Sequence, residues 1–317
     1  MSAETTDEAV SMVGLVKRYG THEAVDGIDL VIRRGEFFGL LGPNGAGKTT
    51  TIGMLCGFIE PTQGHIRIEG MPALPRSNTL KRKLGLVPQE LAFYPTLSAH
   101  DNLAFFGRIF GLQGQHLQSR INTVLAMARL DQRDHEPVTQ FSSGMKRRLN
   151  IAIGMLHEPE ILVLDEPTVG IDAQSRSAIL ETLQQLNRDG VTVIYSTHHM
   201  EEAQRLCGRV AIMDHGRVIA TDSPRRLVRS LGDGIIEIEF AGPPVDACVE
   251  KLQALGTLRL QREDRSAFSL QAPEPEMMLP RLLEVVRGFD VSIRSLRLLE
   301  PNLETVFLKL TGRQLRD

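Results

Sequence analysis

The stretch that decides the fold is Gly42-Pro-Asn-Gly-Ala-Gly-Lys-Thr49, with an apolar run before it at 36–41 and a helix-forming run after it at 50–55. This order predicts a strand, a glycine-rich loop and a helix. The glycines let successive backbone N–H groups point into the loop, and the helix N-terminus adds the positive end of its dipole. A triphosphate fits such a loop, with Lys48 on its β- and γ-phosphates and the Thr49 hydroxyl on Mg²⁺. The residues expected to bind the nucleotide here are Gly42, Pro43, Asn44, Gly45, Ala46, Gly47, Lys48, Thr49 and Thr50.

Polar side chains also follow three other apolar runs. The run at 161–164 leads into Asp165 and Glu166, the run at 191–195 leads toward His198, and the run at 84–87 leads into Gln89. Continuous apolar runs of this length predict strands that are buried on both faces. Because open α/β sheets bind ligands at the carboxyl ends of their strands, these side chains are expected at one site.

Each of these four side chains has a chemical task available. Asp165 is expected to hold Mg²⁺ through water, and Glu166 to polarise the attacking water as general base. Gln89 is expected to reach the magnesium and the water through its amide oxygen. His198 is expected to hydrogen-bond the γ-phosphate and sense its loss, whereas the neighbouring His199 is expected to face solvent.

Length and composition set the outer limits. The chain has 317 residues, which predicts about two domains. Charged residues make up 24% and the formal net charge is −3, so no basic field favours nucleic acid as a partner. The three cysteines are far apart in the sequence and indicate neither a disulfide framework nor a zinc site. We expect a cytosolic protein, held at a membrane only by a partner.

The first part of the chain predicts an antiparallel pair of strands. Residues 1–9 are polar and are expected to be disordered, and strands are expected at 13–19 and 28–32. Tyr19 has two interpretations, an aromatic platform for adenine or an edge-strand residue that shields the core.

From 91 to about 157 the pattern becomes helical. It opens with an aromatic cluster, for which two interpretations remain: ordinary core, or a groove that accepts a helix of another polypeptide. The members of the cluster are Phe93, Tyr94, Phe105, Phe106 and Phe110.

A second helix start within this region carries unusual charge. Ser142 or Ser143 can cap it, and the basic residues at 146–148 occupy first turns where acids are usual. These basic residues form either a solvated face or a second phosphate site that faces another molecule's nucleotide.

The motifs together resemble the nucleotide-binding subunit of ABC transporters over roughly residues 10–230. The shared motifs, in order, are the phosphate loop, the glutamine loop, the signature loop, the magnesium and base pair, the aspartate loop and the switch histidine. In this sequence they are Gly42 to Thr49, Gln89, Phe141 to Met145, Asp165 with Glu166, Asp172, and His198. The residue sequences at 144–149, 166–172 and 196–203 resemble those of the family branch that exports drugs, lipids or polysaccharides.

The resemblance implies a P-loop ATPase core with an antiparallel β subdomain and an α-helical subdomain. It also implies a head-to-tail homodimer in which each ATP lies on one subunit's Lys48 and Thr49 and under the other subunit's Ser142, Ser143 and Gly144, with Asp172 nearby. ATP and Mg²⁺ are the implied cofactors. The implied partner is an integral membrane permease, contacted through the aromatic region and holding the protein at the inner face of the cell membrane.

One position departs from the family pattern, because the signature usually reads Ser-Gly-Gly and here it reads Ser142-Ser143-Gly144. If position 143 needs a positive φ, serine costs about 1–2 kcal/mol. If it does not, the serine only adds a hydroxyl near the phosphate.

Beyond residue 232 the pattern predicts a separate domain at 233–317 after the ATPase domain at 10–232. The expected order is strand, helix, strand, strand, helix, strand and a final helix at 302–310, which is a small ferredoxin-like α+β unit. The ending resembles the tail of the drug-export branch and implies a regulatory or dimer-stabilising role.

Three functions stay open at this point. The first is ATP hydrolysis that powers export through a separate permease. The others are a soluble non-transport ATPase of the same family and an ATP-gated regulatory protein with weak turnover. The tail is the main argument for export.

Overall fold

The computed structural model describes residues 7–73, 82–230, 234–262, 264–272, 275–289, 291–299 and 302–311. The chain divides into two compact units, the first ending at Pro224 and the second beginning at Arg225. The sequence pattern places the corresponding boundary at 232. The two units are described separately.

An antiparallel sheet opens the first unit, with strand order β2-β1-β4-β5. Its strands are β1 (Glu8–Tyr19), β2 (His22–Arg33), β4 (Gln63–Ile68) and β5 (Met71–Pro72). Glu8 and Ala9 belong to β1, and Ala9 is fully buried, so the expectation of disorder at these two residues was wrong. Residues 1–6 lie outside the described residues.

The second sheet of this unit has six strands in the order β10-β9-β3-β8-β7-β6. All its neighbouring strands are parallel except β9 and β10. They are β3 (Phe37–Leu41), β6 (Leu84–Val87), β7 (Ile161–Asp165), β8 (Thr192–Thr197), β9 (Arg209–Asp214) and β10 (Arg217–Asp222). Every residue of β3, β7 and β8 is buried, as their continuous apolar runs predict.

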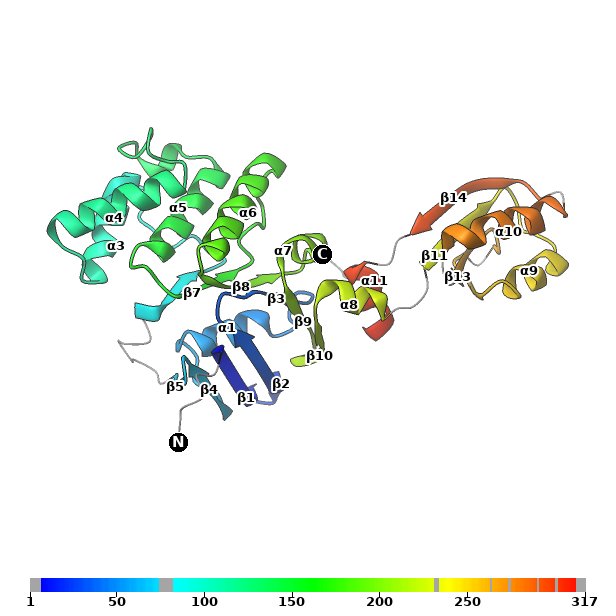
Figure 1. Cartoon of the computed structure of the whole chain (residues 1–317), viewed down its shortest axis with the longest axis horizontal. Coiled ribbons are helices and arrows are strands. Elements are labelled where there is room, and N and C mark those ends of the chain that lie inside the picture. The colour runs from blue at the N-terminus through cyan, green and yellow to red at the C-terminus, as the bar shows by residue number, and fades with distance from the viewer. Residues whose placement is uncertain are drawn as a thin grey trace. The chain divides into compact units, whose positions relative to one another are not determined.

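Helix α1 (Lys48–Leu55) lies between the two sheets (Figure 1). Ile52, Met54 and Leu55 belong to one apolar cluster that also takes in residues of β1, β2, β3, β4, β7, β8 and β9. The glycine loop therefore begins at the end of a buried strand and runs into a helix held on both sides. This packing fixes the direction in which the helix N-terminus points.

The helical region predicted at 91–157 contains three α-helices, α3 (Ala99–Ile109), α4 (Gly114–Met127) and α5 (Ser143–Met155), with a 3₁₀ turn η1 (Val138–Gln140) before α5. Helices α6 (Ala173–Arg188) and α7 (Met200–Leu206) follow, and α8 (Pro224–Arg229) begins at the boundary between the two units. Ser98 caps α3, Ser142 caps α5 and Asp172 caps α6, each accepting a hydrogen bond from a backbone N–H in the first turn.

The second unit confirms the predicted ferredoxin-like order. Its elements are β11 (Gly234–Phe240), α9 (Asp246–Gln253), β12 (Thr257–Leu260), β13 (Ala267–Ala272), α10 (Pro275–Arg287), β14 (Ile293–Leu299) and α11 (Leu303–Thr311). The sheet is antiparallel in the order β12-β13-β11-β14. Ile236, Ile238 and Phe240 alternate into its core.

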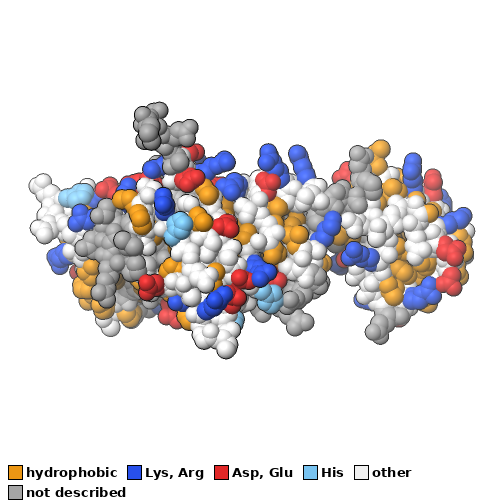
Figure 2. All heavy atoms as spheres, turned by 90° about the horizontal axis from the view of Figure 1, so that it is seen from below, with side chains coloured by type: hydrophobic (Ala, Val, Ile, Leu, Met, Phe, Trp, Pro, Cys, Tyr) orange, Lys and Arg blue, Asp and Glu red, His pale blue; other side chains and the backbone are white. Residues whose placement is uncertain are grey.

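On the face of the molecule in Figure 2, basic and acidic side chains are interspersed rather than gathered by sign, which fits a chain with a formal net charge of −3. In the described parts of the chain, no helix combines the length and the apolarity that crossing a bilayer requires.

Candidate functional site

The glycine loop leaves β3 and enters α1 through Gly47, which caps the helix with φ at +102°. A Cβ at Gly47 would lie 2.6 Å from the carbonyl oxygen of Ala24, so no side chain fits at this position. Gly45, at φ +81°, also adopts the left-handed conformation. Two of the glycines are therefore required by backbone geometry, as the phosphate-loop interpretation predicts.

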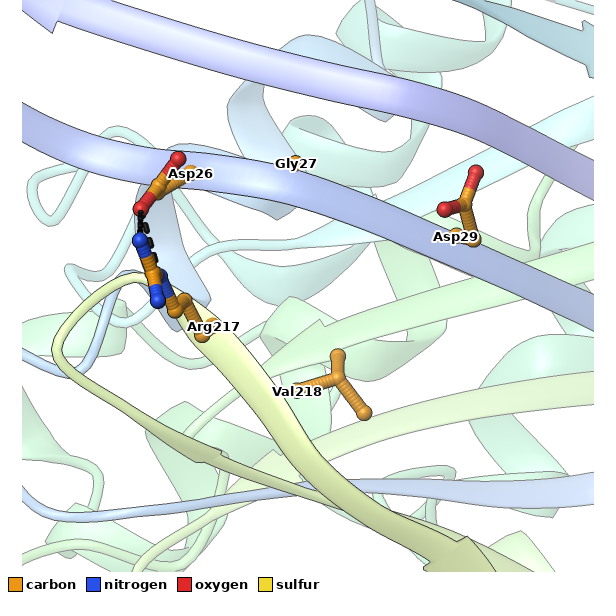
Figure 3. Close-up of a pocket in the computed structure, with 5 residues that line it drawn as sticks. All are labelled: Asp26, Gly27, Asp29, Arg217 and Val218. Carbon is orange, nitrogen blue, oxygen red and sulfur yellow. Dashed lines mark hydrogen bonds and ion pairs between the residues drawn. The ribbon is translucent and has the colours of Figure 1, made fainter.

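The loop is braced from the side by the turn between β9 and β10. The Gly216 N–H donates to the Ala46 carbonyl at 3.1 Å, and the Asp26 N–H donates to the Gly216 carbonyl at 2.9 Å. Asp26 also pairs with Arg217, and both line a pocket of about 460 Å³ with Gly27, Asp29 and Val218 (Figure 3). The pocket lies where β2 of the antiparallel sheet meets β10 of the six-stranded sheet, next to the turn that braces the phosphate loop.

Lys48 is 4% exposed, and its ammonium group lies inside the loop. Its Nζ donates to the carbonyl oxygens of Gly42 at 2.7 Å and Pro43 at 3.1 Å. The same Nζ lies 3.1 Å from Oε1 of Glu166. The structure thus brings together two residues that are 118 positions apart in the sequence and that were predicted as phosphate ligand and general base.

Glu166 is 5% exposed and has a left-handed backbone, with φ at +45°. Its N–H donates both to the Ser196 hydroxyl at 3.0 Å and to the Ser196 carbonyl at 3.2 Å, which holds the unusual conformation in place. A non-glycine residue at positive φ costs free energy and tends to occur at functional sites. The sharp turn after β7 aims the carboxylate at Lys48 and His198.

The charge state of Glu166 follows from these contacts. Burial raises the pKa of its carboxyl, but the attraction and close contact of Lys48, together with the nearby His198 ring, outweigh burial, so the pKa lies below its ordinary value. At neutral pH Glu166 is therefore an ionised carboxylate.

His198 meets the other oxygen of this carboxylate, with its Nδ1 3.3 Å from Oε2 of Glu166. The His199 ring packs against that of His198 at a tilt, with the ring centroids 4.2 Å apart. His199 is half-buried rather than solvent-facing, so that expectation was wrong, and burial lowers the pKa of its ring. His199 is less exposed than expected because its ring packs against the His198 ring just before α7.

Asp165 lies at the end of β7 and is 4% exposed. Its Oδ1 accepts a hydrogen bond from the Ser196 hydroxyl at 2.5 Å. Thr49 is exposed in the first turn of α1, and Gln89 is exposed just beyond β6. These three side chains offer carboxylate, hydroxyl and amide oxygens, the hard donors that Mg²⁺ takes.

Two other predicted site residues, Tyr19 and Asp172, have contacts of their own. Tyr19, at the end of β1, is 49% exposed, with the Lys17 ammonium 5.2 Å from its ring centroid. Asp172 caps α6 by accepting from the Ser175 N–H at 2.9 Å, and this backbone hydrogen bond lowers the pKa of its carboxyl. Across the described residues, no hydrogen bond or ion pair joins Ser142, Ser143 or Gly144 to the phosphate loop.

The start of α5 resolves both alternatives that the sequence left open. Ser142 is the cap and Ser143 is the first helical residue, without a positive φ, so the serine carries no backbone strain. Gly144 is buried, and a Cβ there would lie 2.2 Å from Oγ of Ser175 in α6.

Two of the three basic residues at this helix start point into the protein. Arg147 donates to the carbonyls of Pro88 at 2.9 Å and Gln89 at 2.8 Å. Arg148 donates to the carbonyl of Ala128 at 2.7 Å. Backbone carbonyls therefore hold these two guanidinium groups, so Arg147 and Arg148 do not form the solvated basic face. A second phosphate site at this helix start stays a prediction.

Sequence reasoning missed Ser196, whose hydroxyl and carbonyl hold Asp165 and Glu166 together. A serine at the carboxyl end of a buried strand, two positions before a candidate histidine, was the available signal. Its importance depends on β8 pairing with β7, since Asp165 and Ser196 are register partners in that parallel pair.

Comparisons with known proteins agree with this geometry. The family model described as "ABC transporter" matches residues 25–169. The linearmycin resistance ATP-binding protein LnrL of Bacillus subtilis is 43% identical over 304 residues, which cover 95% of this chain and 97% of that protein. The Nod factor export ATP-binding protein I of Cupriavidus metallidurans is 39% identical over 309 residues, covering 97% and 99%.

Solved structures give the same result for the fold. CbiO1 from Clostridium perfringens, part of an ABC transporter complex, has a TM-score of 0.65 at 27% identity and covers 71% of this chain and 95% of its own. A dimeric ATP-binding cassette in a post-hydrolysis state, bound to ADP and Pi, has a TM-score of 0.62 at 26% identity, covering 68% and 98%. The chain is an ATP-hydrolysing member of the ABC transporter family.

Proposed function

We propose that this chain is the ATPase subunit of an exporter and drives a drug, lipid or polysaccharide through a separate membrane permease. The relatives named for resistance and export match 95% and 97% of the chain, including the second unit. The observation that carries the proposal is the meeting of Lys48, Glu166 and His198 at the ends of β3, β7 and β8.

The contact between Lys48 and Glu166 suggests how nucleotide binding prepares the base. In the structure, the ammonium group is held by two loop carbonyls and by Oε1 of Glu166. Phosphate oxygens in the loop compete for the same N–H donors. As Lys48 turns to the phosphates, Glu166 loses that donor and can accept the proton of an attacking water, while His198 keeps the other oxygen of the carboxylate oriented.

The residues near the loop fit Mg²⁺. Thr49 and Asp165 would hold the ion, Asp165 through water, with Gln89 as a further oxygen ligand. Asp165 is suitable because its carboxylate is buried and one oxygen is fixed by Ser196. When bound, Mg²⁺ neutralises charge on the β- and γ-phosphates.

We infer that the site is completed by a second copy of the chain. Ser142, Ser143 and Gly144 would cover the nucleotide held by the partner's phosphate loop, with Asp172 beside them. The free N–H groups at the start of α5 suit a phosphate, and Ser142 and Ser143 are exposed there. Tyr19 would stack on adenine, since its ring is half exposed.

The aromatic cluster suits the permease contact. Tyr94 and Phe105 are 48% and 38% exposed, and their rings meet edge to face with centroids 5.0 Å apart. Phe106 and Phe110 are half-buried, and Phe110 stacks on His157 at 4.0 Å. An exposed aromatic surface with a fixed geometry is typical of interfaces. Binding a permease there would hold the protein at the inner face of the membrane.

The experiment that tests the proposal is Glu166→Gln in the full chain. We expect the variant to bind ATP, to lose turnover by about 10²–10⁴-fold, and to accumulate as a dimer in ATP on size-exclusion chromatography with light scattering. Glu181→Gln is the matched control, because Glu181 is an exposed glutamate of α6. Unchanged turnover in Glu166→Gln would remove this residue from the role of base.

A further inference from the structure

A second buried carboxylate, Glu202 of α7, lies behind the site described above and is 7% exposed. Its Oε2 accepts hydrogen bonds from Tyr195 at 2.5 Å, from Thr168 at 2.9 Å and from Thr197 at 3.4 Å. Three hydroxyl groups thus converge on one oxygen atom. The Tyr195 and Thr168 hydroxyls also lie 3.2 Å from each other.

The hydroxyl donors come from the segments that carry the reacting groups. Thr168 follows Glu166 by two residues, Thr197 directly precedes His198, and Tyr195 directly precedes Ser196. Thr197 has a second contact, since its hydroxyl accepts from the His199 N–H at 2.9 Å. The Glu202 side chain therefore contacts both the turn that carries Glu166 and the end of β8 that precedes His198.

The other oxygen of Glu202 faces a cation from a third segment. Arg176 Nε lies 3.6 Å from Oε1, and Arg176 stands in the first turn of α6, one turn after its cap Asp172. A buried carboxylate is costly unless it is paired and hydrogen-bonded. Here Oε2 takes all three hydrogen bonds, while Oε1 has the ion pair with Arg176 and no hydrogen bond among the described residues. Removing the carboxylate would leave three buried hydroxyls without their shared acceptor.

We propose that Glu202 is a positioning residue for ATP hydrolysis, which holds the segments of Glu166, His198 and Asp172 in their working arrangement. This inference rests on the ATPase function of the site. Within the described chain, no hydrogen bond or ion pair joins Glu202 to a phosphate-loop residue, so its effect is expected on the chemical step rather than on nucleotide binding. Small displacements of reacting groups are enough to slow catalysis strongly.

Steady-state ATPase kinetics of the full chain test this inference with Glu202→Gln and Glu202→Ala. The matched control is Glu201→Gln, because Glu201 is the neighbouring residue of α7 and is exposed. Glutamine can still accept from the hydroxyls through its amide oxygen but cannot pair with Arg176 by charge. We expect kcat to fall about 10- to 100-fold for alanine and less for glutamine, with KM for ATP and the affinity for a fluorescent ATP analogue within about twofold of the parent.

Tyr195→Phe is the second variant, because it removes one donor and keeps the ring that contacts Phe37 at a centroid distance of 6.0 Å. It should lower kcat by a few fold at unchanged KM. A purely structural role would lower the melting temperature and leave kcat per folded molecule at the parent value, and that result would overturn the proposal. Parallel losses of ATP affinity and kcat would overturn it too. If the parent chain itself fails to hydrolyse ATP, the proposed function fails instead.

Discussion

At the scale of single residues, the central feature is the Glu166 carboxylate, which has the Lys48 ammonium beside one oxygen and the His198 ring beside the other. Glu166 lies 3.1 Å from Lys48 and 3.3 Å from His198, at a backbone φ of +45°. The strained turn aims the carboxylate, and the two partners keep it ionised. Local strain is thus held by long-range contacts that the site uses.

The lowered pKa of Glu166 predicts a pH dependence of stability. A carboxyl whose pKa falls below its ordinary value of 4.5 on folding contributes stability above that pH, and the contribution is lost as the pH falls through the folded value. The difference in melting temperature between the parent and Glu166→Gln, without nucleotide, should therefore be constant from pH 7 to about 5 and shrink at lower pH. A difference that stays flat down to pH about 3.5 would contradict a lowered pKa.

Ser143 gives a second prediction at this scale. Because it is the first residue of α5 and has no positive φ, it is not a strained substitute for glycine. We expect Ser143→Gly to leave the ATPase rate unchanged or to raise it, with at most about 1 kcal/mol lost from stability. Turnover and urea unfolding measure the two effects. A large fall in turnover would show that the hydroxyl is itself a working ligand.

At the scale of elements, the position of α5 depends on its contacts with α6 and with the segment after β6. Gly144 lets α5 approach α6, and Arg147 holds the backbone around Gln89 through two carbonyls. The helix start that is proposed to cover the partner's nucleotide is therefore packed against the two segments that carry Asp172 and Gln89.

The α5–α6 approach predicts a specific suppressor. In Gly144→Ala the new Cβ would lie 2.2 Å from Oγ and 2.3 Å from Cβ of Ser175. We expect a loss of about 1–3 kcal/mol in the free energy of unfolding without nucleotide. Adding Ser175→Gly removes both atoms and should restore most of the loss in a double-mutant cycle by urea unfolding. An equal cost in both backgrounds would place the strain elsewhere.

At the scale of the whole molecule, each compact unit has its own buried apolar cluster. One cluster joins the two sheets of the first unit around α1, and the other joins β11, β13, α9 and α10 of the second. The phosphate loop and its partners belong to the first unit alone. Damage to the second core should therefore spare nucleotide binding.

Phe240→Ala tests this separation. Phe240 is fully buried in the second core, and its removal should cost that unit about 3–5 kcal/mol. Calorimetry should show one transition moved to lower temperature, with ATP affinity unchanged. Leu260→Ala is the matched control, since Leu260 lies in the same sheet and is 52% exposed. A parallel fall in ATP affinity would mean that the two cores unfold as one.

Much of this architecture was predictable from the sequence because its causes are local. Apolar runs predicted the buried strands β3, β7 and β8, and the glycine pattern predicted a loop whose Gly47 tolerates no side chain. Alternation predicted β11, and the order of elements predicted the ferredoxin-like sheet of the second unit. Residue type, spacing and the motifs of the family were sufficient for these features.

The tertiary structure alone decided which polar groups meet. That Glu166 is held by Ser196, that Arg147 is taken up by the carbonyls near Gln89, and that Glu202 gathers three hydroxyls depends on segments far apart in the chain. The parallel pairing of β7 with β8 brings Glu166 and Ser196 together, and it also brings together the hydroxyl groups around Glu202. Such contacts lack a local pattern, because each polar group binds whatever partner folding places within hydrogen-bond distance.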